Sequence, residues 1–310
     1  MIPLKKDEIT PEWFYINRRQ FLRSAALVGA GAVLAACAPG VTPTPEEEAV
    51  ITTQAIGPDG EELTPYESIT TYNNFYEFSL FKEKVAELAS DYNTDNWQIE
   101  VSGLVKNPTT FTMQDILDNF EQEERIYRLR CVEGWSMVIP WVGFSLSKLL
   151  DVVGPTADAQ YVRFESDMDE KQMPNVSKPT FPWPYQEGLR LDEAQNDLAT
   201  LATGLYGKPM PGQNGAPIRM VVPWKYGFKS AKSIKKIELV AQQPDTFWNT
   251  SAPNEYGFYS NVNPNVPHPR WMQDSERRIG ELKRRPTLMF NGYEDEVGYL
   301  YEGMDLRINY

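Results

Sequence analysis

The stretch ERIYRLRCVEGWSMVIPW, residues Glu124–Trp141, contains one of the two cysteines of a 310-residue chain. Apolar and polar residues alternate through IYRLRCVE, and this alternation is typical of a strand. Side chains two positions apart on a strand point to the same face of the sheet. We therefore expect Cys131 and Glu133 to lie side by side, a thiol next to a carboxylate.

The chemistry of Cys131 has two interpretations. A buried thiol can serve simply as a small hydrophobic side chain. Here, however, Arg125, Arg128 and Arg130 precede the cysteine, and neighbouring positive charge favours the thiolate over the thiol. A thiolate is a soft ligand that suits a transition metal. Cys131 is therefore a candidate metal ligand, with Glu133 as its acidic neighbour.

The other cysteine, Cys37, follows a segment typical of export. Arg18 and Arg19 begin RRQFLR, which fits the twin-arginine export pattern, and an apolar stretch follows from about residue 25 to residue 36. This stretch is shorter than the roughly 20 apolar residues of a membrane-spanning helix and has the length of a signal peptide's apolar region. We expect a twin-arginine lipoprotein signal peptide over residues 1–36, lipidation of Cys37, and an extracytoplasmic protein held on the membrane surface. The alternative is an ordinary cleavage site with an incidental cysteine.

Composition divides and limits the rest of the chain. Residues 37–70 are rich in proline and acidic residues, so we expect a flexible tether there and a folded domain over residues 71–310. The net charge of −13 argues against nucleic acid or anionic lipid as a partner. His268 is the only histidine, which excludes a zinc site built on several histidines. Its proline-rich surroundings favour a surface or packing role.

Periodicity predicts more strands than helices. Strands are expected in WQIEVSGLV, IYRLRCV, QYVRFES, APIRMVVP and SIKKIELV. Helices are expected in MQDILDNF, where Thr112 can cap the first turn, and from Ser145 to Val153, where Gly154 ends the helix. LDEAQ is expected to form a helical turn. The uneven mixture predicts an α+β fold with strands dominant.

Two stretches combine glycine with basic residues. PGQNGAPIRM contains Arg219, and WKYGFKSAKSIKK places Lys225, Lys229 and Lys232 around a glycine turn. Backbone N–H groups and basic side chains can together bind a phosphate. A run of charge is more often a solvated face, so the pattern alone is weak, although basic clusters stand out in so acidic a chain.

Five blocks of sequence carry a resemblance to a known family. They are YNNFYEF from Tyr72, the stretch quoted at the start, YGKPMPGQNGAPIRMVVPWKYGFKSAKSI from Tyr206, WNTSAPNEYGFYSNVNPNVPHPRW from Trp248, and PTLMFNGYEDEVGYLYEGMDLR from Pro286. Together they resemble the catalytic subunits of bacterial molybdenum-dependent protein-methionine-sulfoxide reductases, which belong to the sulfite-oxidase family. The resemblance extends from about residue 70 to the last residue.

The resemblance implies a sulfite-oxidase-type molybdopterin-binding fold and a Mo-molybdopterin cofactor, with one molybdenum per chain. Cys131 would bind the metal, and Glu133 would orient substrate or relay protons. The family's pterin and phosphate contacts carry over to Asn73, Tyr76, Glu77, Ser166, Asn214, Arg219, Ser230, Ala231 and Lys232. Ser166 stands where family members carry threonine, which weakens that one assignment.

The implied reaction is reduction of methionine sulfoxide residues in oxidised envelope proteins by oxygen-atom transfer to Mo(IV). The sequence has no histidine pair for haem and no cysteine set for an iron–sulfur cluster, so the electrons must come from outside this chain. The resemblance implies a membrane haem-binding subunit that draws on the quinone pool. The alternatives are another oxidoreductase of this family, acting on sulfite or on small S- or N-oxides, and a non-catalytic lipid-anchored binding protein.

Overall fold

The structure is a computed structural model that describes residues 57–310. The expected signal peptide, the lipidation site at Cys37 and the first part of the expected tether lie outside the described residues. Within them, no helix combines the length and the apolar character needed to cross a membrane.

The described chain alternates short helices with strands. The strands are β1 (Gln98–Gly103), β2 (Thr109–Thr112), β3 (Glu123–Arg130), β4 (Trp135–Ser145), β5 (Tyr161–Ser166), β6 (Gln186–Arg190), β7 (Thr200–Leu205), β8 (Lys208–Pro209), β9 (Arg219–Val221), β10 (Ile234–Val240), β11 (Ser275–Arg278) and β12 (Arg284–Pro286). The α-helices are α2 (Tyr66–Thr71), α3 (Val85–Leu88), α4 (Met113–Asn119), α5 (Leu146–Val153), α6 (Leu191–Gln195), α7 (Phe247–Ser251) and α8 (Glu294–Val297). The 3₁₀ turns are η2 (Pro58–Gly60), η3 (Lys82–Lys84), η4 (Gly212–Asn214), η5 (Gly227–Lys229), η6 (Met289–Gly292) and η7 (Gly298–Tyr301).

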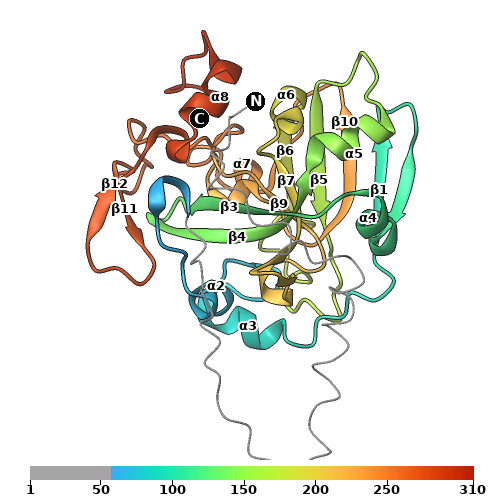
Figure 1. Ribbon diagram of the computed structural model, residues 1–310, viewed down its shortest axis with the longest axis horizontal. Helices are drawn as coiled ribbons and strands as arrows, with labels where there is room; N and C mark the ends of the chain where they lie inside the picture. The colour runs from blue at the N-terminus through green and yellow to red at the C-terminus, as the bar shows by residue number, and fades with distance from the viewer. Residues whose placement is uncertain (1–56) are drawn as a thin grey trace, which may run out of the picture. The chain divides into compact units, whose positions relative to one another are not determined.

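The strands form two sheets. One has the order β2-β1-β10-β5-β6, in which β1 and β10 are parallel and the other pairs are antiparallel. The other has the order β12-β11-β4-β7-β8, with β3 added to β4 and β9 added to β7. In Figure 1, β3 and β4 run across the page while β1, β5 and β10 stand upright. The strand-dominated α+β class expected from the sequence is confirmed.

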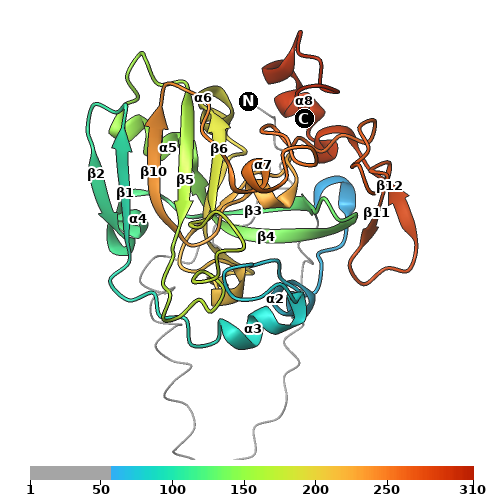
Figure 2. The same ribbon diagram turned by 180° about the vertical axis from the view of Figure 1, so that it is seen from behind.

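One apolar cluster joins the two sheets. It includes Val101 and Phe164 from the first sheet and Ile139 and Leu201 from the second, each no more than 1% exposed. Strand β4 is buried along most of its length and pairs with β3 from Gly143 to Ser136. This long pair carries the chain to the turn that contains Cys131. Figure 2 shows helices α2 and α3 on one side of β4 and α7 on the other.

The two expected helices form where the sequence predicted them. At the start of α4, the Thr112 hydroxyl accepts a hydrogen bond from Asp115 N at 3.1 Å, and the Asp115 carboxylate accepts one from Thr112 N at 2.9 Å. This reciprocal arrangement satisfies two backbone donors that a helix start otherwise leaves free. Helix α5 ends at Gly154, whose φ of +64° suits glycine.

The expected tether is too long at its C-terminal end. Residues 57–70 are part of the fold rather than flexible: Thr64 is buried, and its hydroxyl accepts a hydrogen bond from Val138 N at 2.9 Å. Glu61 accepts from Arg128 at 2.5 Å and from Arg285 at 2.7 Å. Composition could not reveal this, because the arginines that pair with the acidic segment are distant in the sequence.

Candidate active site

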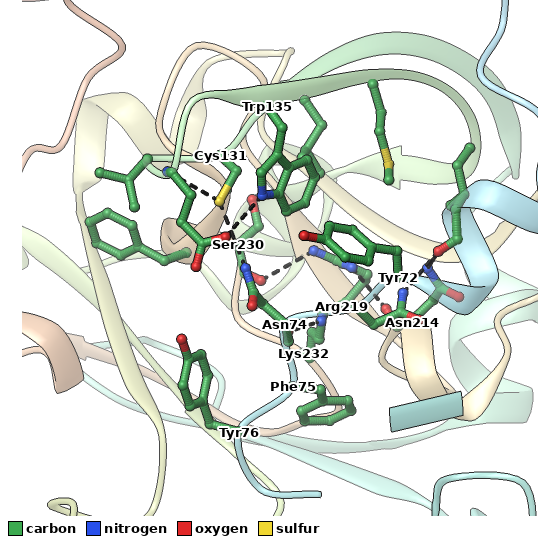
Figure 3. Close-up of a pocket in the computed structure, with 18 of the residues that line it drawn as sticks. Tyr72, Asn74, Phe75, Tyr76, Cys131, Trp135, Asn214, Arg219, Ser230 and Lys232 are labelled. Atoms are coloured by element: carbon green, nitrogen blue, oxygen red, sulfur yellow. Dashed lines mark hydrogen bonds between the residues drawn. The ribbon is translucent and has the colours of Figure 1, made fainter. Parts of the chain in front are cut away.

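A cavity that is partly open to solvent lies between the segment after α2 and the turn between β3 and β4 (Figure 3). The segment after α2 supplies Asn73, Asn74 and Tyr76, and the β3–β4 turn supplies Cys131 and Glu133. Further walls come from the region of η4, from β9 and from the residues around η5. The cavity therefore collects residues from segments far apart in the chain.

Cys131 lies one residue beyond the end of β3. Its N–H donates to Trp135 O at 2.9 Å, and Gly134 N donates to Cys131 O at 3.0 Å. Gly134 has a φ of +85°, which allows this tight turn. The expectation that Cys131 and Glu133 share one face of a strand is therefore wrong. The turn nevertheless brings them together, because Glu133 N lies 3.5 Å from the Cys131 sulfur.

The carbonyl of Val132 fixes this turn from behind. It accepts hydrogen bonds from Trp271 Nε1 at 2.9 Å and from Gln273 Nε2 at 2.8 Å. His268 stacks on the Trp271 ring with a centroid separation of 3.9 Å. The histidine is buried, so of the two roles expected for it, the packing role applies.

Contrary to expectation, positive charge does not decide the pKa of Cys131: Arg130 acts to lower it, but burial has the larger and opposite effect, and the three nearby arginines are all paired. Each forms an ion pair with a carboxylate: Arg125 with Glu123, Arg128 with Glu61, and Arg130 with Glu276. Burial raises the pKa of the Cys131 thiol to about 12, and the Glu133 carboxylate adds to the rise. Without a bound metal, Cys131 is therefore a thiol at neutral pH.

Glu133 is held at the opening of the cavity by two donors. Its carboxylate accepts from Trp135 Nε1 at 2.9 Å and pairs with Lys82 Nζ at 3.0 Å. Burial acts to lower the pKa of Lys82, but the Glu133 carboxylate outweighs it and the net shift is upward. Asn74 Nδ2 lies 3.7 Å from the Cys131 sulfur, so side-chain and backbone donors both approach this atom.

Two basic side chains also line the cavity, Arg219 and Lys232. The Arg219 guanidinium is 4% exposed and donates to Asn214 O at 2.8 Å, while the Lys232 ammonium donates to the backbone of Asn74 (Figure 3). In the described part of the chain, neither forms an ion pair with a carboxylate. Burial lowers the pKa of Arg219 and of Lys232. These two cations can accept an anionic group.

Two amide side chains beside them have unused acceptors. Asn73 and Asn214 both donate to Ile69 O, at 2.8 and 3.1 Å. Their Oδ1 atoms are buried and have no hydrogen-bond partner within residues 57–310. A buried acceptor without a partner is costly, so these oxygens indicate that the cavity binds a ligand with N–H donors. Glu77 is also buried, and burial raises its pKa to about 7.

Most of the candidate residues line this cavity. They are Asn73, Tyr76, Glu77, Cys131, Glu133, Asn214, Arg219, Ser230 and Lys232. Ser166 and Ala231 are buried but are not among its lining residues, and their assignment to the cofactor stays a prediction.

Two lysines of the expected anion-binding stretch have another role. Lys225 pairs with Glu193 and Lys229 pairs with Glu187, each at 2.6 Å and with both side chains fully buried. Their charges are already neutralised inside the core, so their expected place in a phosphate site is wrong. Of the three lysines, Lys232 alone lines the cavity.

Sequence reasoning missed several lining residues. Asn74, Trp135, Trp248 and Tyr256 line the cavity, and Lys82 contacts it through Glu133. Asn74 directly follows Asn73, a predicted site residue in YNNFYEF, and this position could have indicated that Asn74 also lines the site. Trp248, in α7, and Tyr256 stand in the block of resemblance that begins at Trp248, but their residue types gave no further signal, because aromatic residues are as common in packing as in binding.

Comparison with known proteins identifies the family. A family model described as "Oxidoreductase molybdopterin binding domain" matches residues 86–248. The protein-methionine-sulfoxide reductase catalytic subunit MsrP of Ralstonia nicotianae is 53% identical, with 97% of this chain and 94% of that protein covered. The MsrP proteins of Burkholderia mallei and Campylobacter jejuni are each 51% identical and cover 98% and 97% of this chain, and 95% and 99% of their own lengths.

Among solved structures, the sulfane dehydrogenase SoxCD of Paracoccus pantotrophus is similar over 60% of this chain and 48% of its own, with 18% identity and a TM-score of 0.43. The family match and the full-length relatives confirm the expected molybdopterin-binding fold and a molybdopterin cofactor. The chain therefore belongs to the molybdopterin-binding oxidoreductases and, among them, to the family of protein-methionine-sulfoxide reductase catalytic subunits.

Proposed function

We propose that this enzyme reduces methionine sulfoxide residues in proteins, with one Mo-molybdopterin per chain and Cys131 as the protein ligand of the metal. The observation that carries the proposal is the arrangement of the cavity. Cys131 lines it together with two basic side chains, buried Arg219 and partly buried Lys232, neither of which forms an ion pair with a carboxylate of the described residues. A cofactor that carries both a metal and a phosphate would use the thiol for the metal and the two basic side chains for the phosphate.

The residues present fit this cofactor. Arg219 and Lys232 would bind its phosphate, which would replace water around two desolvated charges. The unpaired oxygens of Asn73 and Asn214 would accept hydrogen bonds from the N–H groups of the pterin. Glu77, whose pKa burial raises to about 7, can act as donor or acceptor beside them.

When bound, the cofactor supplies a metal that exchanges an oxygen atom with a sulfoxide in a two-electron step. The residues around Cys131 would position its sulfur atom and adjust its properties as a metal ligand. Asn74 and the backbone N–H of Glu133 approach the sulfur atom, at 3.7 and 3.5 Å, and hydrogen bonds to a ligating sulfur tune the metal. Reduction of a sulfoxide to a thioether and water consumes two electrons and two protons. The Glu133 carboxylate stands at the opening, where it can pass protons from solvent.

Electron supply and location complete the proposal. The electrons would come from the quinone pool through a membrane haem-binding subunit. The chain would be exported by the twin-arginine pathway and anchored through lipid on Cys37, which keeps it close to such a partner. Its substrates would be oxidised proteins of the cell envelope. The sequence of the first 37 residues supports the export and the lipid anchor, while the electron donor and the envelope substrates rest on the family resemblance.

The test is to reduce the molybdenum-loaded enzyme chemically and give it an oxidised unfolded protein. Loss of methionine sulfoxide is followed by mass spectrometry, and molybdenum per chain is measured in parallel. Cys131→Ser should remain folded and lose the activity. Unchanged methionine sulfoxide, together with fast sulfite oxidation or N-oxide reduction, would favour another oxidoreductase of the same family.

A further inference from the structure

The rim of the cavity next to α7 is aromatic and continues outward beyond the cavity. Tyr76 and Trp248 line the cavity, and Phe181 and Trp183 extend the same surface away from it. All four side chains are partly exposed. We call these four residues the aromatic band. In Figure 3, Tyr76 lies across the cavity from Cys131, so the band begins opposite the proposed metal ligand.

The band is continuous. The ring centroids of Tyr76 and Trp248 are 5.3 Å apart, those of Tyr76 and Phe181 are 6.0 Å apart, and those of Phe181 and Trp183 are 5.7 Å apart. All three pairs are edge-on, within the separation at which aromatic rings attract each other. The rings therefore support one another as a single surface.

The loop that carries Phe181 and Trp183 is fixed to the cavity wall. Asn175 donates from its side chain to Tyr76 O and from its backbone to Glu77 O, both at 2.9 Å. Met173 and Val176 are buried in a small apolar cluster. The loop thus holds its position without burying Phe181 completely, which leaves an apolar surface open to solvent.

The opening of the cavity is therefore polar on one side and apolar on another. The ion pair of Lys82 with Glu133 marks the polar side, and the aromatic band marks the apolar side. A contiguous apolar surface that is partly open to solvent beside a site is typical of a binding surface. A protein substrate must lay its backbone across this opening while one side chain enters, so its neighbouring residues contact the rim.

We infer that the aromatic band binds apolar side chains that flank the methionine sulfoxide in an unfolded polypeptide. This inference rests on the proposed function and specifies its substrate: an extended segment with leucine-like residues close to the oxidised methionine. Aromatic rings accept varied aliphatic side chains and sulfur groups, so the preference is for apolar character rather than for one sequence. The band would leave small sulfoxides, which do not reach Phe181, unaffected.

The test compares two pentapeptides with central methionine sulfoxide, one flanked by glycines and one by leucines, on the molybdenum-loaded enzyme. We expect the leucine peptide to have a KM roughly fivefold lower, because it buries apolar surface on the band. Phe181→Ser should remove this difference without changing kcat/KM for free methionine sulfoxide, which also shows that the variant is folded. Phe181→Leu should retain most of the difference. Tyr299→Ala, at an aromatic side chain that is exposed elsewhere, is the control and should behave as the wild type.

Binding of both peptides is measured in the same samples by tryptophan fluorescence, independently of turnover. Equal affinity for the two peptides in the wild type, or an equal loss for both in Phe181→Ser, overturns the inference. If no sulfoxide is reduced but the leucine peptide still binds more tightly through Phe181, the inference stands and the proposed function fails. If Phe181→Ser slows only reduction of the enzyme by its electron-donating partner, the band is that partner's docking surface and the inference is wrong.

Discussion

Cys131 illustrates how burial overrides local charge. The arginines that precede it were expected to favour a thiolate, but each forms an ion pair with a carboxylate. The largest effect on the thiol is therefore its burial away from water, which raises its pKa to about 12. Sequence identifies the residue that can bind a metal, but it does not show whether neighbouring charges are already paired.

This raised pKa gives a measurable reactivity. In cofactor-free Cys37→Ala protein, alkylation of Cys131 by iodoacetamide at pH 8 should be at least roughly tenfold slower than alkylation of the same protein in denaturant, because only the thiolate reacts. The rate should continue to rise with pH beyond the range in which an ordinary thiol has fully ionised. Equal rates in folded and denatured protein at pH 8 would show that burial does not raise the pKa of this thiol.

The elements that sequence predicted well have local causes. Helix α4 follows from its capping box and α5 from its apolar spacing and Gly154, while β1, β5 and β10 follow from alternation. The elements that it missed depend on distant partners. Helix α2 was assigned to a tether, and the end of β3 was placed too late because alternation continues through a turn that Gly134 permits.

The capping box of α4 provides a prediction for an element far from the chemistry. Thr112→Ala should lower the free energy of unfolding by about 1 kcal/mol, because the substitution leaves the backbone N–H of Asp115 without its acceptor. Denaturant unfolding measures this loss. Thr112→Ser keeps the hydroxyl and is the matched control. Since residue 112 does not line the cavity, kcat should not change in either variant, and a fall in kcat would contradict the separation of helix and site.

The position of the turn between β3 and β4 should depend on the two side-chain hydrogen bonds to Val132 O. Trp271→Phe keeps the stacking with His268 but removes one of the two hydrogen bonds to Val132 O. We expect a loss of stability of about 1 kcal/mol and a severalfold lower kcat with cofactor retained, because the metal ligand precedes Val132. Trp183→Phe is the control for stability, since its indole also bonds one backbone carbonyl, that of Lys178. Unchanged kcat in Trp271→Phe would show that the turn does not need this support.

At the scale of the whole molecule, sequence predicted the class of fold and most of the cavity. It could not distinguish Lys232 from Lys225 and Lys229, which are close in sequence and similarly spaced. The difference arises from the acids that fold against them: Glu193 and Glu187 neutralise the latter two in the core. Nor could it show the aromatic rim, because Phe181 and Trp248 meet only when the chain is folded.

Attachment to the membrane is a prediction about the molecule as a whole. Wild-type protein should partition with membranes and incorporate labelled fatty acid, and Cys37→Ala should do neither, because a single residue would carry the lipid. Replacement of Arg18 and Arg19 by lysine should leave cofactor-loaded precursor inside the cell. A wild-type protein that is unlabelled and absent from membranes would reduce the LAAC sequence to an ordinary cleavage site.

Arg219 couples cofactor binding to the stability of the entire fold. Its guanidinium is buried over the Trp141 ring without a carboxylate partner in the described residues, and burial lowers its pKa. The folded state therefore holds this proton less tightly than the unfolded state, so the charge costs stability at neutral pH. Arg219→Met keeps apolar contact with the ring and removes the charge.

We expect Arg219→Met to stabilise the cofactor-free protein by roughly 1–3 kcal/mol and to lose most of its bound molybdopterin, since the phosphate would lose its principal partner. Thermal unfolding and molybdenum content, measured with and without cofactor loading, give both quantities. In the wild type, loading should raise Tm strongly because the phosphate compensates the buried charge; in Arg219→Met, this rise should nearly vanish. A destabilised cofactor-free variant that still binds molybdopterin at the wild-type level would contradict the assignment of Arg219 to the phosphate.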